Sequence, residues 1–456
     1  MGERDTHQTE ASRSMIRRRG FLKASGAGAV ALTAGCSGNG GGDTTTDGDD
    51  TTTAGGDGQG TTQGSPTTTP LDIDGPIVFG SISPLPGEFA AGTAFREFGE
   101  LFVDQINNDG GLLGTEVKLV GKNSQLQPSK ARQRYRELIL EDEADVTFGI
   151  FQTESGTVIQ DELSNFETLH ISGGVAGSDI PEQIANDYEN YRYWFRSNWN
   201  GRQQGSAVGK YAQERWADLG YDSIAIVDED VAGFAPIVEN AIAGIPDDID
   251  VAFRQTFSSD TKDFTPILDK AASEDIDFMF AFIGFGGVPL TIQWSKRQPD
   301  FSLGGGDIFS ASKSHYENTE GAIEGIWTYV SGSGPGFEHT EKTSEVISAH
   351  NEFHGHDPVH ANGFPHYESM ETFVKAVQAT GSLDTDDLIA YMESDLEYTG
   401  VTGPIQYHDQ NGKYPHDTVY SLDHSPPVIQ WQDGNQVGLW PDANKTGEYQ
   451  QPSFLS

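Results

Sequence analysis

The sequence contains a single cysteine, Cys36, so it offers no partner for an intramolecular disulfide. Basic residues are scarce: 28 Lys and Arg stand against 69 Asp and Glu, which gives a formal net charge of −41. The acidic residues are spread through every segment. Such a surface disfavours nucleic acid and anionic membranes as partners. It is typical of proteins from halophiles, in which salt screens the repulsion between like charges.

Signatures of catalysis are also missing. The chain has no G-x-S-x-G segment and no cysteine after Cys36 that could act as a nucleophile. It has neither H-E-x-x-H nor G-x-x-x-x-G-K-[ST], which would indicate a zinc or a phosphate site. Five histidines between residues 350 and 366 leave metal binding open as an alternative, since His350 and His354 could share one helix face. We expect no catalysis, no cofactor and no metal.

The N-terminus carries export signals. Arg18–Lys23 (RRGFLK) matches a twin-arginine signal, and the apolar stretch after it is too short to span a bilayer. Thr33–Cys36 (TAGC) has the small residues of a lipobox, which predicts a signal peptide over residues 1–35 and a lipid on Cys36. The alternative is an incidental thiol in a removed segment. Residues 36–75 have almost nothing apolar and are expected to form a disordered tether.

The first apolar stretch after this tether reads as strand, loop, helix and strand. Ile77–Phe79 is a run typical of a strand buried on both faces. Apolar residues then recur at three- and four-residue steps from Phe95 to Ile106, which predicts an amphipathic helix. Asp109–Gly111 ends that helix, and Val117–Val120 starts the next strand. Parallel sheets bind ligands beyond the carboxyl ends of their strands, so we expect residues 83–92 to lie beside a ligand.

The alternation of strands and helices continues along the chain. Each further strand ends in a polar or glycine-rich loop where a ligand could bind. These predicted strand-to-loop passages are residues 145–157, 169–177, 223–234, 278–287 and 303–309.

In this order, the patterns resemble the leucine/isoleucine/valine-type solute-binding proteins of ABC transporters. The most specific match is the helix end Asp104–Gly111 (DQINNDGG), and the loop Ser83–Gly87 (SPLPG) is a looser one. Further matches are the runs TKDF and DIDF at residues 261–264 and 275–278, GAIEGIWT at 321–328, and the closing hairpin near 402–412. The resemblance covers residues 76 to about 440.

The resemblance implies an α/β fold of the periplasmic binding protein type I class. Two doubly wound parallel-sheet lobes would be joined by a three-segment hinge near Ser197, Ser331 and Thr402. We assign residues 76–197 and 330–400 to the first lobe, 198–329 and 401–440 to the second, and 441–456 to a C-terminal tail.

The resemblance also implies ligand contacts. The expected contacts are Ser83, Phe89, Thr153, Ser155, Gly174, Val175 and Ala176 in the first lobe, and Phe234, Phe285 and Asp307 in the second. Thr153 and Ser155 would offer a ligand carboxylate the N-terminus of a helix, although plain N-capping is an alternative for both.

In the second lobe, Phe234 replaces a usual tyrosine, or is a core contact. Phe285 is the expected aromatic contact. Asp307 is the nearest match to the carboxylate that binds the ligand's ammonium group, with a solvated loop aspartate as the alternative. Two departures weaken a plain amino-acid ligand: Ala176 or Gly177 stands where threonine is usual, and Glu154 would repel a carboxylate unless it points away. Glu154 could instead indicate a ligand with a cationic or amide end.

These features predict an extracytoplasmic, lipid-anchored solute-binding protein of an ABC importer. It would capture a small polar ligand, such as a branched-chain or other amino acid, urea or an amide, and deliver it to the permease subunits. Its only membrane contact would be the lipid, and it would bind no nucleic acid. Two alternatives stay open: a sensor that reports to a receptor, and an anchored hydrolase.

Overall fold

The computed structural model describes residues 74–84, 89–231, 233–421 and 424–455. The predicted signal peptide, Cys36 and nearly all of the predicted tether lie outside the described residues. Within those residues, no helix has the length and apolar character needed to cross a membrane.

A five-stranded parallel sheet, in the order β2-β1-β3-β4-β5, forms the centre of the first lobe. Its interior strand β1 is buried along its whole length, as the apolar run at its start predicts. The strands are β1 (Ile77–Ser83), β2 (Val117–Asn123), β3 (Val146–Gly149), β4 (His170–Ser172) and β5 (Trp194–Arg196).

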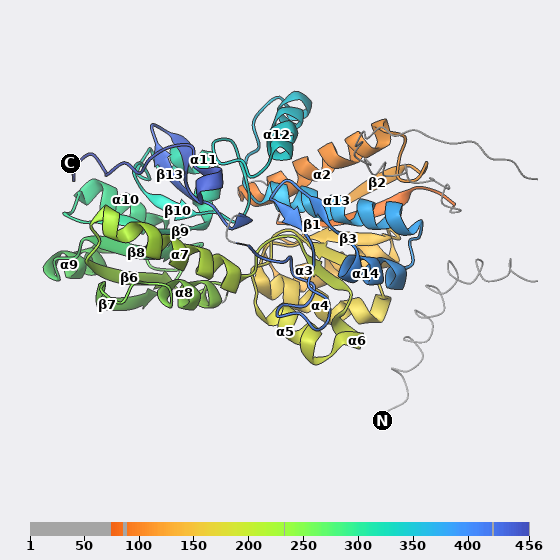
Figure 1. The fold of residues 1–456 in the computed structure, drawn as a ribbon, viewed down its shortest axis with the longest axis horizontal. Coiled ribbons are helices and arrows are strands. Elements are labelled where there is room, and N and C mark those ends of the chain that lie inside the picture. The colour runs from red at the N-terminus through yellow and green to blue at the C-terminus, as the bar shows by residue number, and fades with distance from the viewer. Residues whose placement is uncertain (1–73, 85–88, 232, 422–423, 456) are drawn as a thin grey trace, which may run out of the picture. The chain divides into compact units, whose positions relative to one another are not determined.

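Helices cover both faces of this first sheet, with α2 and α13 on one face and α3 and α4 on the other (Figure 1). Their apolar stripes and the sheet share one core, which includes Phe79, Phe98 and Phe373. The helices are α2 (Ala90–Asn108), α3 (Pro128–Leu140), α4 (Thr153–Phe166), α5 (Asp179–Asn186), α6 (Tyr188–Tyr191), α12 (Glu341–His354), α13 (Gly363–Thr380) and α14 (Thr385–Ser394).

The second lobe holds a seven-stranded sheet in the order β14-β13-β10-β9-β8-β6-β7. Five of its strands are parallel, and an antiparallel hairpin extends one edge. The strands are β6 (Ser223–Glu229), β7 (Asp250–Phe257), β8 (Phe278–Ile283), β9 (Ser302–Asp307), β10 (Trp327–Tyr329), β13 (Val428–Gln432) and β14 (Asn435–Trp440).

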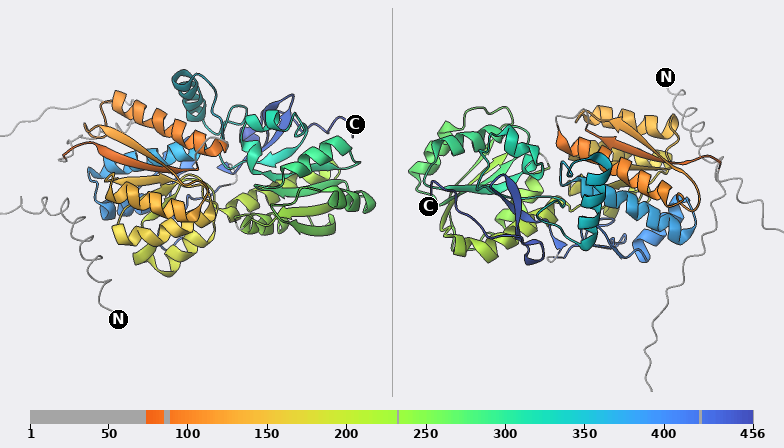
Figure 2. Two further views of the ribbon diagram at one scale, coloured as in Figure 1. Left: turned by 180° about the vertical axis from the view of Figure 1, so that it is seen from behind. Right: turned by 90° about the horizontal axis from the view of Figure 1, so that it is seen from above.

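The second sheet has a hydrophobic core on each of its two faces, and alternate side chains of β8 point into one core or the other. On β8, Phe278 and Phe280 pack with α7 and α8, whereas Met279 and Ala281 pack with α9 and α10 on the opposite face. The flanking helices are visible from two further directions in Figure 2. They are α7 (Gly201–Leu219), α8 (Ala235–Ile242), α9 (Thr265–Ser273), α10 (Val288–Arg297) and α11 (Ser314–Asn318), with the 3-10 turns η1 (Ile308–Ala311) and η3 (Asp442–Asn444).

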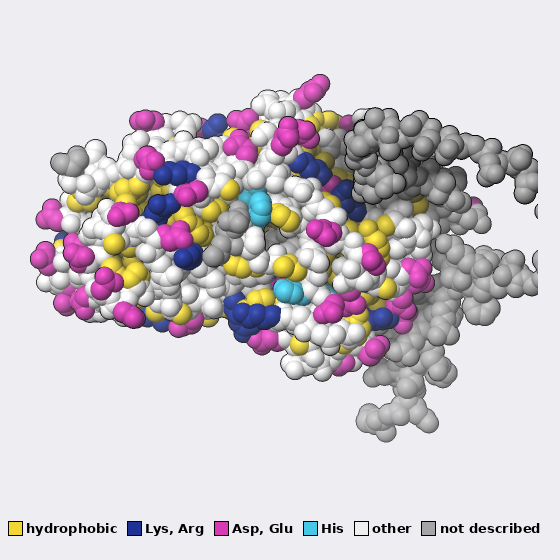
Figure 3. All heavy atoms as spheres, viewed as in Figure 1, with side chains coloured by type: hydrophobic (Ala, Val, Ile, Leu, Met, Phe, Trp, Pro, Cys, Tyr) yellow, Lys and Arg dark blue, Asp and Glu magenta, His cyan; other side chains and the backbone are white. Residues whose placement is uncertain are grey.

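The chain passes three times between the two sheets. It leaves the first after β5, returns after β10 to form α12, and crosses again before β13. The predicted two-lobed α/β architecture with a three-segment hinge is therefore confirmed. Acidic side chains are scattered over the face of the molecule shown in Figure 3, as the composition predicts.

The third crossing lies later than the position near Thr402 that we expected for the third hinge segment. We assigned residues 401–440 to the second lobe, but Val401, Ile405 and Tyr407 pack in the core of the first. The short pair β11 (Tyr398–Thr399) and β12 (Pro404–Ile405) forms its own two-stranded sheet. Asp417 still pairs with Arg196 beside β5, so the crossing falls between residues 418 and 428.

Candidate ligand-binding site

A pocket of about 100 Å³ opens where strands of both sheets end, between the two lobes. From the first lobe, the wall includes Phe151 after β3, the start of α4, and the loop after β4. From the second lobe it includes the loops after β6, β8 and β9 and the end of β10. A doubly wound sheet places a ligand at this edge.

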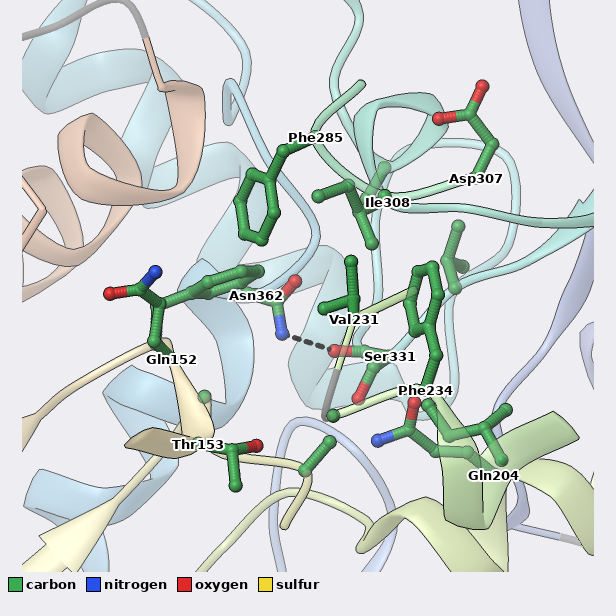
Figure 4. A pocket seen from close by; sticks show the side chains of 18 of the residues that line it. Gln152, Thr153, Gln204, Val231, Phe234, Phe285, Asp307, Ile308, Ser331 and Asn362 are labelled. Carbon is green, nitrogen blue, oxygen red and sulfur yellow. Dashed lines mark hydrogen bonds between the residues drawn. The ribbon is translucent and has the colours of Figure 1, made fainter. Parts of the chain in front are cut away.

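The structure brings six of the ten expected contact residues into the wall of this pocket. They are Thr153, Gly174, Ala176, Phe234, Phe285 and Asp307. Figure 4 shows Phe285 and Phe234 on opposite sides of the cavity, with Thr153 below them. That these residues contact a ligand remains a prediction.

The other four expected residues lie outside the pocket wall, for separable reasons. Val175 is fully buried and belongs to the core of the first lobe. Ser83 is the last residue of β1 and is buried, with its carbonyl accepting a hydrogen bond from the Ser124 N–H. The Ser155 hydroxyl donates to the side chain of Gln152, so it acts within its own helix turn.

Phe89 differs from the other three, because it supports the pocket from behind. Its ring centroid lies 4.8 Å from that of Phe151 and 6.1 Å from that of Phe285, two rings that line the pocket. These two rings come from different lobes, so Phe89 links the lobes beside the site. His360 packs against the same ring, and burial lowers its pKa to about 4, so this imidazole is neutral at neutral pH.

Asp307 lines the pocket, and each of its carboxylate oxygens already has a partner within the second lobe. Its Oδ1 accepts the N–H of Phe309 at 2.9 Å, and its Oδ2 lies 3.0 Å from Nε2 of His315. Figure 4 shows the carboxylate pointing away from Phe285 and Phe234. The Asp307 side chain thus caps the start of η1. This capping role is an alternative to the predicted role of binding a ligand's ammonium group.

The sequence analysis did not predict several of the residues that line the pocket, although it named Ser331 as a hinge position. Gln204, Tyr329, Ser331 and Asn362 line the wall, and the amide of Asn362 donates to the Ser331 carbonyl at 2.9 Å. No local pattern marks them, because they lie on three segments brought together only by the crossings. Glu154, whose direction the sequence left open, also belongs to the wall.

A buried network fixes the first crossing next to the pocket. Arg196, at the end of β5, makes a bidentate ion pair with Asp417, through bonds of 2.7 and 2.6 Å. Its remaining nitrogen donates to the carbonyls of Val175 and Gly177 in the pocket loop. Both charged side chains are almost completely buried. The pair therefore ties together β5, the loop after β4 and the returning segment near residue 417.

The histidines near residue 350 surround one carboxylate. Glu97 of α2 lies 3.5 Å from Nε2 of His350, and His354 bonds to the Glu97 carbonyl. The pKa of Glu97 is lowered, since its interactions with these histidines outweigh the opposing effect of burial, the largest single influence. In the described part of the chain, no group of three or more His, Cys, Asp or Glu is arranged to hold a metal ion.

Comparison with known proteins agrees with this architecture. A family profile described as periplasmic binding protein matches residues 76–422. The chain belongs to this family of two-lobed binding proteins. A search of the curated proteins found no match.

Three solved structures illustrate the similarity, each at a sequence identity that establishes fold alone. A putative branched-chain amino acid ABC transporter protein from Silicibacter pomeroyi is 18% identical, with a TM-score of 0.69, covering 83% of this chain and 100% of that one. The substrate-binding protein LivJ from Streptococcus pneumoniae, in complex with isoleucine, is 17% identical, with a TM-score of 0.67 and coverage of 80% and 100%. A solute-binding protein from R. palustris, in complex with benzoate, is 18% identical, with a TM-score of 0.64 and coverage of 82% and 98%.

Proposed function

We propose that this protein is an extracytoplasmic solute-binding lipoprotein of an ABC importer. One observation carries the proposal: a small pocket lies at the strand ends of two lobes joined by three crossings, and both lobes contribute its wall. Closure around the hinge would bury a ligand and present the closed form to a permease. Proteins of similar fold hold isoleucine or benzoate, which supports a small organic ligand.

Ligand binding is tested by a thermal-shift screen in molar KCl. The panel holds leucine, isoleucine, urea, short amides, benzoate and small organic cations. A true ligand raises the unfolding midpoint by mass action, with a shift that grows with concentration. The same ligand should reduce the radius of gyration measured by small-angle scattering. Release of a hydrolysed or altered product from any of these compounds would contradict a binding function without catalysis.

Export and anchoring are tested separately, in cells. Cys36→Ser should move the protein from the membrane fraction to the medium, because it removes the acceptor of the lipid. Replacing Arg18 and Arg19 together with lysine should keep the protein inside the cell. Unchanged fractionation of both variants would contradict the proposed route.

A further inference from the structure

The wall of the inter-lobe pocket is rich in aromatic rings, and its ionisable side chains are of one sign. Phe151, Phe234, Phe285 and Tyr329 contribute rings to the wall. Glu154 and Asp307 are the charged residues found there, and no Lys, Arg or His occurs among its described residues.

A third carboxylate lies directly behind the pocket. Glu229, at the end of β6, is only 2% exposed. Its oxygens accept hydrogen bonds from the N–H groups of Gly284 and Gly286, both at 2.8 Å, and from the hydroxyl of Ser259. All three donors are neutral, and within the described residues no basic side chain forms an ion pair with Glu229. A buried carboxylate usually has a cationic partner, and among the described residues Glu229 has none.

Glu229 also fixes the position of an aromatic ring. Phe285 stands between the two glycines that Glu229 binds; the residue is 38% exposed and lines the pocket. The loop has little room to move, since a Cβ at Gly286 would lie 2.0 Å from the Ser259 carbonyl oxygen. The carboxylate of Glu229 therefore holds the turn after β8 that carries the Phe285 ring.

The two acids in the wall differ in their partners. Asp307 accepts the N–H of Phe309 and lies against the imidazole of His315. Glu154 lies exposed in the first turn of α4, and it forms no ion pair with a described residue. The N-terminus of α4 would otherwise favour an anion, but Glu154 already supplies negative charge there. A ligand carboxylate placed at this turn would meet a like charge.

We propose that the ligand of this pocket is a small organic cation whose charge lies on an alkylated nitrogen, held against the ring of Phe285 between Glu229 and Glu154. Ring faces attract such a cation through their quadrupole, while their apolar surface accepts its alkyl groups. This inference rests on the proposed function and narrows its ligand class.

The experiment compares molecules of one shape and different charge. Choline and 3,3-dimethyl-1-butanol differ in a single atom, nitrogen against carbon, so size and apolar area are matched. Leucine and benzoate represent zwitterionic and anionic ligands. The full chain is titrated with each probe by calorimetry in molar KCl. We expect choline to bind at least about tenfold more tightly than its neutral analogue, as a desolvated cation–ring contact allows.

Two variants separate charge from shape. Phe285→Leu keeps an apolar side chain but removes the ring face, so it should weaken choline binding much more than binding of 3,3-dimethyl-1-butanol. Glu229→Gln should reduce the difference in affinity between choline and 3,3-dimethyl-1-butanol. Glu274→Gln, which removes an exposed carboxylate at the end of α9, is the matched control and should change neither probe.

The outcomes distinguish this inference from the function on which it rests. If the neutral analogue binds as tightly as choline, the inference is wrong. If leucine or benzoate binds and choline does not, the ligand class is wrong and the binding function stands. If no probe in this set or in the thermal-shift panel binds saturably, both fail.

Discussion

Glu368 shows how a single buried residue can make folding depend on pH. It lies fully buried on α13, and its carboxyl group accepts hydrogen bonds from the N–H and the hydroxyl of Thr402, at 2.9 and 2.6 Å. Burial raises its pKa from 4.5 to about 8. The folded chain therefore keeps a proton that the unfolded chain releases between these values. Stability should fall as the pH rises from about 5 to about 8, then level off.

Glu368→Gln tests this prediction, since glutamine keeps the shape of the carboxyl group but cannot ionise. The variant should lose the part of the pH slope that Glu368 contributes, which amounts to at most about 4–5 kcal/mol across the window. Chemical denaturation at about pH 5, 6.5 and 8.5, at constant salt, measures the free energy of unfolding. The same slope in both proteins would show that the carboxyl group does not titrate as argued.

At the residue scale, the sequence could predict which loops reach the site but not which side chains point into it. The loops follow from strand ends, which the apolar runs mark. The direction of Asp307 depends on His315, eight residues later, and that of Glu229 on two distant glycine N–H groups. No local sequence pattern indicates either contact. The sequence analysis therefore did not identify Glu229, and it predicted an ammonium contact for Asp307, whose oxygens have other partners in the structure.

At the element scale, the ion pair between Arg196 and Asp417 joins β5 to the returning segment. Asp417→Asn should destabilise the fold by about 3–5 kcal/mol, because it leaves the buried guanidinium without a countercharge. The double variant Arg196→Met with Asp417→Leu should recover part of that loss, since it removes both buried charges. Urea denaturation of this double variant and of the single variants Arg196→Met and Asp417→Leu gives the coupling energy between the two side chains. A coupling energy near zero would contradict the view that Arg196 and Asp417 stabilise the fold as a pair.

The turn after β8 is a second element whose geometry can be tested. Gly286→Ala should displace this turn, because its Cβ would collide with the carbonyl of Ser259. We expect a stability loss of about 1–3 kcal/mol and loss of the thermal shift given by any panel ligand. Gly121→Ala on β2 is the matched control, since its Cβ would meet nothing within 4 Å. An unchanged ligand shift in Gly286→Ala would show that the turn does not shape the pocket.

At the scale of the whole molecule, the fold was predictable because its determinants are local. Apolar runs and amphipathic periods repeat in the order that a two-lobed α/β protein requires. The boundary of the third crossing was not predictable. It depends on Tyr407, whose hydroxyl lies 2.8 Å from that of Ser197 and 3.2 Å from that of Thr372 in the first lobe. Contacts between residues 35 and 210 positions apart leave no periodic trace in the sequence.

The net charge of −41 makes stability a function of salt. The 28 basic residues can pair with fewer than half of the 69 acidic ones, so repulsion among carboxylates outweighs the surface ion pairs that salt also weakens. Raising KCl from about 0.1 to about 1 M shortens the screening length from about 10 to about 3 Å. The unfolding midpoint should therefore rise by at least about 5 °C. Sucrose at equal osmolality is the control, because it is excluded from the surface without screening charge. An equal rise in sucrose would assign the effect to exclusion rather than to electrostatics.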